Sequence, residues 1–336
     1  MKILVIGAGA IGGSLACLLT QTDANVTILE KNPKVLSVIQ EKGVTLRDGD
    51  KSYNGRVTAL AELSGDIKYD CCFSATRAYH LESAVKSVLP YLKPDACVIS
   101  MNNGVCIDAL SEVVGDKNSA WCSINFGAGI ESEGCYYIKI PGGLTIGSKN
   151  GLTLSMRRVI DKLNEVIPVK VTDNIVGALY SKMLINSCIT STAVVSGDTL
   201  GDILSTKAGK RVFVGIIREG MRVAKASGIK VPNYGKGLNY KLFASKNPIG
   251  AMYRSIVFPH LKKKYGGRTS ATLEALKRGT KTEIDYFNGY VVSLAERYGL
   301  DVPVNKAIVE CVKMVESDLS QIKSENIAKI AFAKKI

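Results

Sequence analysis

Short apolar runs alternate with helical patterns in the first half of the chain. Alternation of this kind is typical of a parallel sheet covered by helices on both faces. We therefore expect a doubly wound α/β domain at the start of the chain. The expected strands are Lys2–Ile6, Asn25–Leu29, Tyr69–Ser74, Ala96–Met101 and, more weakly, Val44–Leu46, and the expected helices are Gly12–Gln21, Lys34–Glu41 and His80–Leu89.

The pattern changes after Ser119, where shorter strand-like runs are separated by glycine pairs and Pro141. Runs separated in this way are typical of hairpins, so we expect an antiparallel extension of the sheet. One helix, Leu154–Val166, interrupts these runs. The runs themselves are Ala120–Phe126, Cys135–Ile140, Leu144–Ile146 and Val169–Val171.

From Asn174 onward the strand pattern stops and the spacing of apolar residues is helical. The expected helices are Asn174–Val195, Thr206–Ser227, Lys236–Ala244, Ser270–Arg278, Lys281–Tyr298 and Asn305–Ser324. We therefore divide the chain into an α/β domain at 1–173, an all-helical domain at 174–325 and a basic tail at 326–336.

A glycine-rich segment connects the first strand to the first helix. It has the order Gly7, Ala8, Gly9, Ala10, Ile11, Gly12. In a dinucleotide-binding fold, the first glycine allows a tight turn, the second allows backbone to approach the pyrophosphate, and the third allows close helix packing. The start of the helix supplies N–H donors to the phosphates. The segment therefore predicts a Rossmann-type site for a nicotinamide dinucleotide, and an incidental glycine-rich turn is the lesser alternative.

The second strand ends in Glu30 and Lys31, where the residue that meets the adenosine ribose normally lies. Glu30 favours a free 2′-hydroxyl, whereas Lys31 favours a 2′-phosphate. Lys31 could also simply neutralise Glu30 at the surface. We expect NADPH, with Glu30 rotated outward, and NADH remains an alternative because of Glu30.

Two further polar segments follow strands of the expected sheet. Ligands in doubly wound sheets bind beyond the carboxyl ends of strands, so Arg77 and Asn103 are expected to face the cofactor. Asn103 next to Gly104 could hydrogen-bond a carboxylate or a ribose. An ordinary Asn-Gly turn explains the same pair equally well.

The helical half carries a polar stripe and an acidic segment. Lys182, Asn186 and Thr190 recur every four residues on an otherwise apolar helix, so they share one face. A buried lysine is costly unless it is paired and is a candidate for acid–base chemistry, although a lysine at a helix edge can also snorkel to solvent. Farther on, Glu283 is either a functional carboxylate or part of an acidic first turn.

Composition narrows the class of protein. The chain has 336 residues and a formal charge of +14, but its basic residues are diffuse and lack the motifs and interleaved aromatics of nucleic-acid binders. Its nine cysteines are odd in number and scattered, which favours core packing in a reducing compartment without a metal site. No run is apolar and long enough to span a membrane. We expect a cytoplasmic protein without nucleic-acid or membrane partners.

The chain resembles the ketopantoate reductase family over nearly its whole length. The resemblance rests on K-I-x-V-x-G-x-G-A-x-G at the start, Asn103-Gly104, S-K-M-L-I-N at Ser181–Asn186, and T-E-I-D-Y-F-N-G at Thr282–Gly289. It implies a Rossmann domain followed by a helical domain like that of 6-phosphogluconate dehydrogenase. It also implies NADPH-dependent reduction of 2-dehydropantoate (ketopantoate) to pantoate in pantothenate and coenzyme A synthesis.

The resemblance also implies roles for individual residues. Lys182 would be the general acid and Glu283 its partner, while Asn103 and Asn186 would position substrate and cofactor. Three positions depart from the family pattern: Arg77 replaces a lysine, Thr190 replaces an asparagine found in some members, and Ala271 replaces a serine that holds the substrate carboxylate. Ser270 and Thr272 flank Ala271, and we expect Ser270 to take over its role.

Two other functions stay open. A related reductase acting on a different 2-keto acid would keep Lys182 and Glu283 and change the pocket. A non-catalytic protein that senses a dinucleotide would have little reason to keep Lys182, Asn186 and Glu283 together. A homodimer is compatible with either enzyme, although the sequence does not determine the oligomeric state.

Overall fold

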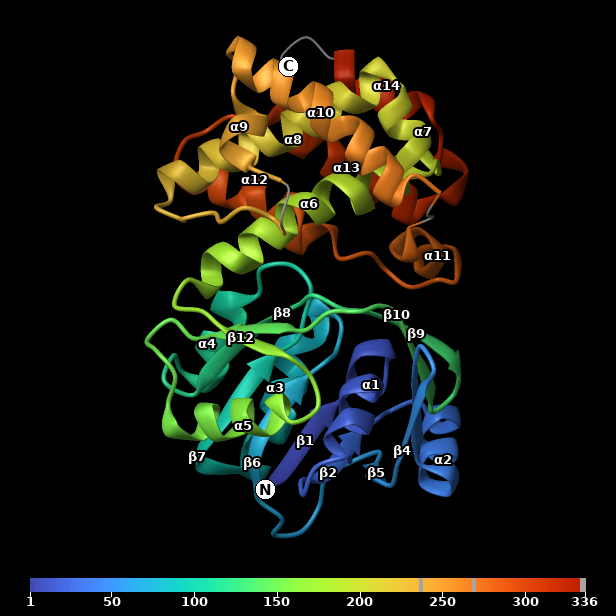
Figure 1. Cartoon of the computed structure of the whole chain (residues 1–336), viewed down its shortest axis with the longest axis vertical. Coiled ribbons are helices and arrows are strands. Elements are labelled where there is room, and N and C mark those ends of the chain that lie inside the picture. The colour runs from blue at the N-terminus through green and yellow to red at the C-terminus, as the bar shows by residue number, and fades with distance from the viewer. Residues whose placement is uncertain (236–237, 268–269, 333–336) are drawn as a thin grey trace. The chain divides into compact units, whose positions relative to one another are not determined.

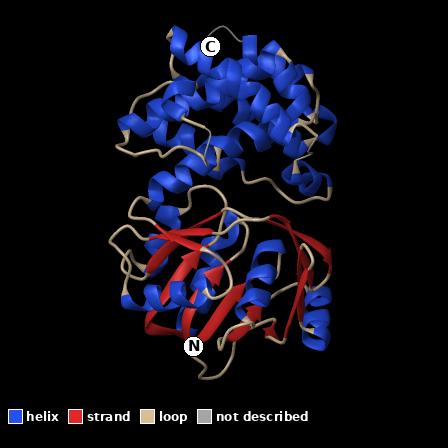
Figure 2. Ribbon diagram, viewed as in Figure 1, coloured by secondary structure: helices blue, strands red, loops and turns tan. Residues whose placement is uncertain are grey.

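The computed structural model describes residues 1–235, 238–267 and 270–332. The chain separates into two compact units, Met1–Ile175 and Val176–Ile336. Strands lie in the first unit, and the described part of the second unit is built from helices (Figure 2). The expected α/β domain followed by an all-helical domain is confirmed.

An eight-stranded sheet forms the centre of the first unit (Figure 1). Its strand order is β12-β11-β8-β7-β6-β1-β2-β5, and all neighbouring pairs are parallel except β11 with β8. The strands are β1 (Lys2–Ile6), β2 (Asn25–Leu29), β5 (Thr58–Leu60), β6 (Tyr69–Ser74), β7 (Leu92–Ser100), β8 (Ser119–Ile124), β11 (Leu144–Gly147) and β12 (Val169–Val171).

A second, four-stranded sheet has the order β4-β3-β10-β9. It consists of β3 (Val44–Asp48), β4 (Lys51–Gly55), β9 (Gly127–Ser132) and β10 (Cys135–Ile140). The run at Val44–Leu46 was expected in the parallel sheet, and this expectation is wrong. It forms a hairpin with β4 and pairs with β10, while β5 takes the place beside β2.

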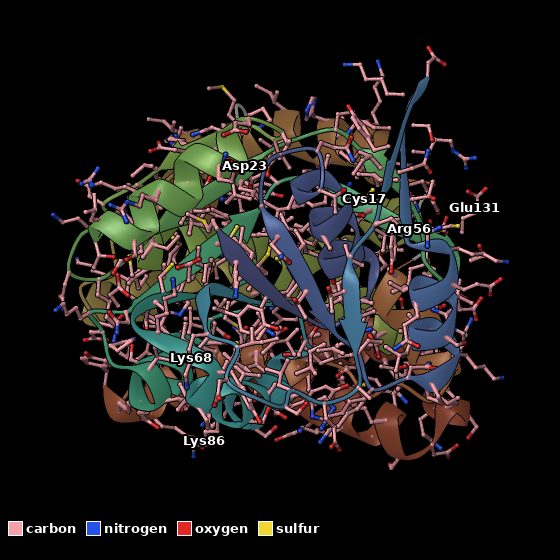
Figure 3. All side chains as sticks on the ribbon, turned by 90° about the horizontal axis from the view of Figure 1, so that it is seen from below. Cys17, Asp23, Arg56, Lys68, Lys86 and Glu131 are labelled. Atoms are coloured by element: carbon pink, nitrogen blue, oxygen red, sulfur yellow. The ribbon has the colours of Figure 1, made fainter. Side chains whose placement is uncertain are left out.

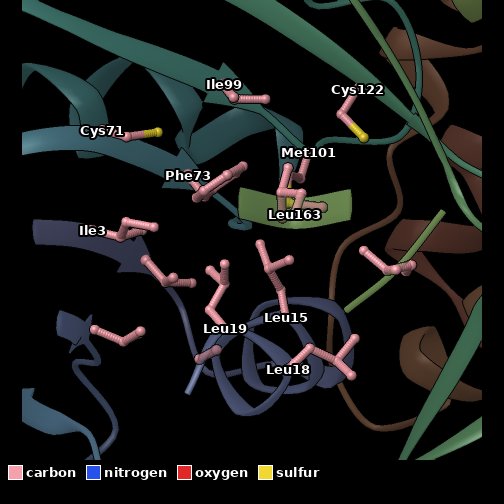
Figure 4. Packing of buried hydrophobic residues seen from close by; sticks show 14 of the residues in the cluster. Ile3, Leu15, Leu18, Leu19, Cys71, Phe73, Ile99, Met101, Cys122 and Leu163 are labelled. Carbon is pink, nitrogen blue, oxygen red and sulfur yellow. The ribbon is translucent and has the colours of Figure 1, made fainter. Parts of the chain in front are cut away.

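Helix α1 (Ala10–Leu19) contacts strands of both sheets, which explains why its residues from Gly12 to Leu19 are all buried. A helix that is apolar on every side needs partners on every side. Figure 4 shows Leu15 and Leu19 of α1 on the side of the helix that faces Ile3 and Phe73 of the large sheet. The other helices of this unit are α2 (Pro33–Lys42), α3 (Leu81–Val88), α4 (Ile107–Val114) and α5 (Leu154–Asn164).

Buried cysteines contribute to this core. Cys71, Cys72 and Cys97 on β6 and β7 are at most 1% exposed, as expected for thiols in apolar strands. Cys17 of α1 is also buried, and burial raises the pKa of its thiol to about 12. In Figure 3, Cys17 lies inside the unit, whereas the charged side chains of Lys86 and Glu131 lie at its edge.

The second unit begins with the long helix α6 (Ile175–Ser196). Its other helices are α7 (Leu200–Ser205), α8 (Lys207–Ala226), α9 (Tyr240–Ala244), α10 (Pro248–Tyr265), α11 (Ala271–Lys277), α12 (Asn288–Arg297), α13 (Pro303–Ser317) and α14 (Glu325–Phe332). Over the described ranges, none of the helices is long and apolar enough to cross a bilayer.

Three expectations for this unit need correction. The segment 326–336 was expected to be a basic tail, but Glu325–Phe332 forms helix α14 with Ile327 and Ile330 buried, and 333–336 lie outside the described residues. The helix expected from Lys281 begins only at Asn288, after a short 3-10 turn at Ile284–Tyr286. The helix expected from Lys236 begins at Tyr240, and residues 236–237 are not described.

Candidate active site

The turn after β1 has the geometry that a phosphate cradle needs. Gly7 has φ +92°, a conformation that L side chains rarely adopt. A Cβ added to Gly12 would lie 2.0 Å from the Gly7 carbonyl oxygen and 2.9 Å from Cβ of Ala75. These two glycines therefore let the turn and the start of α1 lie against the ends of β1 and β6.

The start of α1 is open at the middle glycine. A Cβ on Gly9 would have no neighbouring atom within 4 Å, and Gly9 itself is exposed. Ala10 and Ile11, the first residues of the helix, are half-buried. Backbone N–H groups at a helix start attract phosphate, so this cradle fits a dinucleotide. The site residues expected from Gly7 to Gly12 lie together in this one turn.

Sequence reasoning missed Gly13 and Tyr136. A Cβ on Gly13 would lie 1.9 Å from the Tyr136 ring, whose hydroxyl donates a 2.8 Å hydrogen bond to the Ala8 carbonyl oxygen. Tyr136 belongs to β10 of the small sheet, so this sheet supports the glycine turn from outside the Rossmann sheet. Gly13, directly after the third glycine of the motif, was the one feature of the sequence that could have indicated this close contact.

Glu30 is fixed at the end of β2 by main-chain donors. Its Oε2 accepts a 2.7 Å hydrogen bond from the Ala8 N–H, and its Oε1 accepts a 2.7 Å bond from the Asn32 N–H. The carboxylate is thus held against the glycine turn. Lys31, the neighbouring cation, is exposed. The outward rotation of Glu30 that NADPH was expected to require is not the conformation of this structure.

At the ends of β6 and β7 the buried asparagine is Asn102. Its Nδ2 donates a 2.7 Å hydrogen bond to the Thr76 carbonyl oxygen, and its Oδ1 accepts a 2.8 Å bond from the Ser100 hydroxyl. Asn102 therefore ties together the two loops that were expected to face the cofactor. Asn103 and Arg77, the residues expected to contact cofactor, are both exposed.

On helix α6 the expected polar stripe is present. Lys182, Asn186 and Thr190 are half-buried, whereas most other residues from Leu179 to Ser196 are buried. The four-residue spacing places the three side chains along one face of the helix. The stripe is thus the accessible line on a helix that is otherwise core.

One end of this stripe lies in a small cavity of about 10 Å³. Thr190 lines it together with Glu283 and Thr272, and the rest of its wall is largely apolar. A volume of this size is about that of one water molecule. The cavity brings Thr190 and Glu283 together although they are far apart in the sequence.

Ser270 has a different place from the one that its expected role needs. Its hydroxyl caps helix α11 by accepting a 3.4 Å hydrogen bond from the Leu273 N–H, and Ser270 is not among the residues lining the cavity. Thr272, two residues later, does line it. The sequence around Ala271 does not show which of the two hydroxyls faces the cavity. Side-chain direction turns by about 100° per residue in a helix, so neighbouring positions at its start face different sides.

Glu283 is buried and sits in an irregular segment that helix α13 holds in place. The N–H and hydroxyl of Thr282 donate hydrogen bonds of 2.8 and 2.6 Å to Glu316 Oε1. Lys313 forms a 2.6 Å ion pair with Asp285. These contacts hold the chain on both sides of Glu283 against α13, and Ile284–Tyr286 form a 3-10 turn there in place of an α-helix.

A chain of buried hydrogen bonds connects α6 to three other helices. The Ser191 hydroxyl donates to Asn288 Oδ1 (2.6 Å), Asn288 Nδ2 donates to Asn305 Oδ1 (3.0 Å), and Asn305 Nδ2 donates to Glu219 Oε2 (2.7 Å). Ser191 follows Thr190 directly. The network therefore fixes the cavity end of α6 against α12, which starts at Asn288, the asparagine of the T-E-I-D-Y-F-N-G motif.

The two units thus carry complementary groups. The first has a cradle for a dinucleotide, and the second has an ammonium, an amide, two hydroxyls and a buried carboxylate suited to a small polar substrate and to proton transfer. In the described parts of the chain, no three His, Cys, Asp or Glu side chains gather as metal ligands would.

Models of protein families match nearly the whole chain. The model described as "Ketopantoate reductase PanE/ApbA" matches residues 3–151, and the one described as "Ketopantoate reductase PanE/ApbA C terminal" matches residues 174–316. Among curated proteins, the 2-dehydropantoate 2-reductase of Pyrococcus abyssi is 27% identical over 329 residues, covering 94% of this chain and 98% of that protein. The enzyme of the same name from Streptococcus pyogenes serotype M3 is 22% identical and covers 95% and 99%.

Solved structures share the fold. A ketopantoate reductase from Ralstonia eutropha JMP134 has a TM-score of 0.81 at 22% identity, covering 96% of this chain and 99% of that one. A D-mandelate dehydrogenase solved with NADH and anilino(oxo)acetate has a TM-score of 0.79 at 20% identity, covering 95% and 99%. With the glycine turn, the α6 stripe and the matched models in agreement, the chain belongs to the ketopantoate reductase family of oxidoreductases.

Proposed function

We propose that the chain reduces 2-dehydropantoate to pantoate by hydride transfer, with Lys182 as the general acid. The single observation that carries the proposal is the accessible line of Lys182, Asn186 and Thr190 on a buried helix, which ends at a cavity shared with Glu283. A nicotinamide cofactor in the glycine cradle would supply the hydride. The relatives named 2-dehydropantoate 2-reductase support this choice of substrate.

The chain's own groups have distinct tasks in this proposal. As the C2 carbonyl carbon gains a hydride, its oxygen gains negative charge, and the Lys182 ammonium donates the proton that completes the alcohol. Asn186 and Thr190 can hydrogen-bond the polar groups of the substrate, and Glu283 can orient the ammonium or accept from a substrate hydroxyl. A residue that donates a proton in the transition state affects turnover more than binding.

The position of Glu30 supports a proposal for the choice of cofactor. The resemblance implies NADPH, but a 2′-phosphate would meet a carboxylate that two main-chain N–H groups hold against the glycine turn. A carboxylate at the end of the second strand normally accepts from the 2′-hydroxyl of NADH. We therefore propose that NADH is preferred and that NADPH is used less efficiently.

The substitution Lys182→Ala tests the proposal. It should lower kcat by about 10²–10⁴-fold, the range for a general acid, while the affinity for NADH stays unchanged. Lys182→Arg keeps the charge but not a proton that is readily lost, so it should restore little turnover. Steady-state kinetics and NADH fluorescence titration measure the two quantities.

Lys281→Ala is the matched control, because Lys281 is exposed and lies two residues before Glu283. It removes the same charge and should leave kcat within about twofold, as is usual for a substitution at an exposed site. Near wild-type turnover in Lys182→Ala would make Lys182 a structural lysine and would overturn its assignment.

A second function shares the same residues. The loss of serine at Ala271 and of asparagine at Thr190 favours a related reductase whose pocket takes a different 2-keto acid. The buried thiols support a reducing compartment, and we propose the cytoplasm as the location of either activity.

A further inference from the structure

A groove of about 1120 Å³ lies in the second unit, and none of the residues given a role in the proposed reaction lines it. One face of α8 forms one wall, and α9, the segment that follows it, and α10 form the other. The residues before and at the start of α13 complete the lining. In Figure 1 these helices lie side by side within the helical unit, in agreement with their contacts.

The lining is strongly cationic. It includes eight lysine and arginine side chains and two acidic residues, Glu219 and Asp301. Glu219 is already engaged: its carboxylate accepts 2.9 Å hydrogen bonds from the N–H groups of Val304 and Asn305. The groove therefore concentrates a substantial part of the chain's +14 formal charge with little compensation from its own carboxylates.

Two guanidinium groups are fixed side by side in this groove. Arg218 donates to the carbonyl oxygens of Ala244 and Ser245 at 2.9 and 3.1 Å. Arg254 donates to Ser245 as well, at 2.6 Å, and to Phe243 at 2.8 Å. Both groups thus share the Ser245 carbonyl at the end of α9. Partial burial lowers the pKa of both guanidiniums, and the charge of Arg254 lowers that of Arg218 further.

Both arginines keep donors for a ligand. Each guanidinium has five N–H donors, and two on each are used by the carbonyl oxygens of α9 and Ser245. Neither arginine forms an ion pair with a carboxylate among the residues that the structure describes. Paired guanidinium forks match phosphate oxygens in bidentate geometry.

The rest of the groove indicates the size of its ligand. Lys241, Lys246 and Lys225 are exposed along its rim, so they can contact charges several ångströms from the arginine pair. Val214, Met221 and Phe258 give it an apolar part. Its volume exceeds what a single inorganic phosphate needs and is slightly above the roughly 300–1,000 Å³ of typical sites for small organic molecules.

We propose that this groove binds an organic polyphosphate of about nucleotide size, with phosphates on the Arg218–Arg254 pair and the lysine rim. The site lies wholly in the second unit and is separate from the glycine cradle of the first. The proposal does not depend on the reductase activity, and its test uses binding alone.

The experiment is isothermal titration of the full chain with tripolyphosphate and with UTP, in saturating NADH and at fixed ionic strength. Saturating NADH keeps the probes from the glycine cradle. We expect both to bind, UTP at least as tightly as tripolyphosphate. Lys241→Ala/Lys246→Ala should weaken both by about tenfold, as expected for losing hydrogen bonds to charged groups. Both lysines are exposed and make no hydrogen bond among the described residues, so the variant should fold.

Lys207→Ala/Lys263→Ala is the matched control, since it removes two exposed lysines of α8 and α10 that do not line the groove. It should change the affinities by less than about twofold, because screened charges outside the site contribute little. Equal weakening in both double variants, or no binding in saturating NADH, would overturn the proposal. Weaker binding of UTP than of tripolyphosphate would contradict the proposal that the ligand is organic. Tighter binding of a short oligonucleotide than of UTP would show that the groove binds nucleic acid and would overturn the proposal.

Discussion

The proposed preference for NADH rests on Glu30. Glu30→Ala removes the negative charge at the end of β2 and frees the N–H groups of Ala8 and Asn32 to bind a phosphate. The ratio of kcat/KM for NADPH to that for NADH should rise about tenfold or more, since a charge at hydrogen-bonding distance contributes over 1 kcal/mol near a protein surface.

Glu41→Gln provides the control for this change, because Glu41 is exposed on α2 in the same unit. It should leave the cofactor ratio unchanged. A wild-type enzyme that already prefers NADPH strongly would show that Glu30 moves aside on binding, and the expectation drawn from the family would then be right.

The hydroxyls on either side of Ala271 separate into two roles. Thr272 lines the cavity with Glu283 and Thr190, so Thr272→Val should raise KM for the keto acid by about tenfold, as expected when a charged group loses one hydrogen bond. Ser270 caps α11, so Ser270→Ala should lower the free energy of unfolding by about 1 kcal/mol. Kinetics and urea unfolding of both variants measure this. The reverse pattern would restore Ser270 as the substrate-binding residue.

At the scale of elements, helix α13 depends on a carboxylate from another helix. The side chain of its N-cap residue, Val302, makes no capping hydrogen bond. Glu219 of α8 instead accepts hydrogen bonds from the N–H groups of Val304 and Asn305. Burial raises the pKa of Glu219, although these hydrogen bonds and Arg222 oppose the shift. The carboxylate thus stabilises the helix start at the cost of desolvation.

This pKa shift predicts a pH dependence of stability. In the unfolded chain the pKa of a glutamate is about 4.3. Between that pH and the higher pKa of folded Glu219 the folded state binds more protons, so the contribution of Glu219 to the free energy of unfolding falls as the pH rises. The free energy of unfolding of the wild type, minus that of Glu219→Gln, should therefore fall with rising pH. Urea unfolding across this range measures it, with the exposed Glu310→Gln as control, and a constant difference would contradict the shift.

Which elements the sequence could predict depended on how strong and how local their patterns are. The strands β1, β2, β6, β10 and β12 have the predicted bounds, because a continuous apolar or alternating run shows a strand directly. Alternation does not show which sheet a strand joins, so β3 was placed in the wrong one. Helix α10 was missed because its apolar residues do not share one face: Ile249, Met252 and Ile256 are exposed, whereas Val257 and Leu261 are buried.

The candidate site shows the same limit. The glycine turn and the α6 stripe are local patterns, and the structure places their residues as the spacing predicts. The roles of Asn102, Tyr136 and Thr272 were missed, because each depends on a contact with a distant segment. These contacts are with Thr76, with Ala8, and with the cavity wall that includes Glu283. Contacts at such sequence separation leave no periodic signal.

At the scale of the whole molecule, the basic residues are not as diffuse as the sequence suggested. Lysines and arginines separated by up to 44 positions, from Lys210 to Arg254, come together in the groove of the second unit. The two proposed anion sites therefore use different donors. The glycine cradle offers N–H groups at a helix start, and the groove offers guanidinium and ammonium groups.

The substrate tests the account most directly, because the roles proposed for the α6 stripe and Glu283 all refer to one 2-keto acid. The measurement is kcat/KM of the purified chain for ketopantoate, ketoisovalerate and pyruvate in saturating NADH, with pantoate identified as the product. We predict the highest value for ketopantoate, with one pantoate formed for each NADH oxidised. A higher value for ketoisovalerate or pyruvate would make the chain a reductase of another 2-keto acid, and no NADH oxidation with any of the three would contradict the proposed activity.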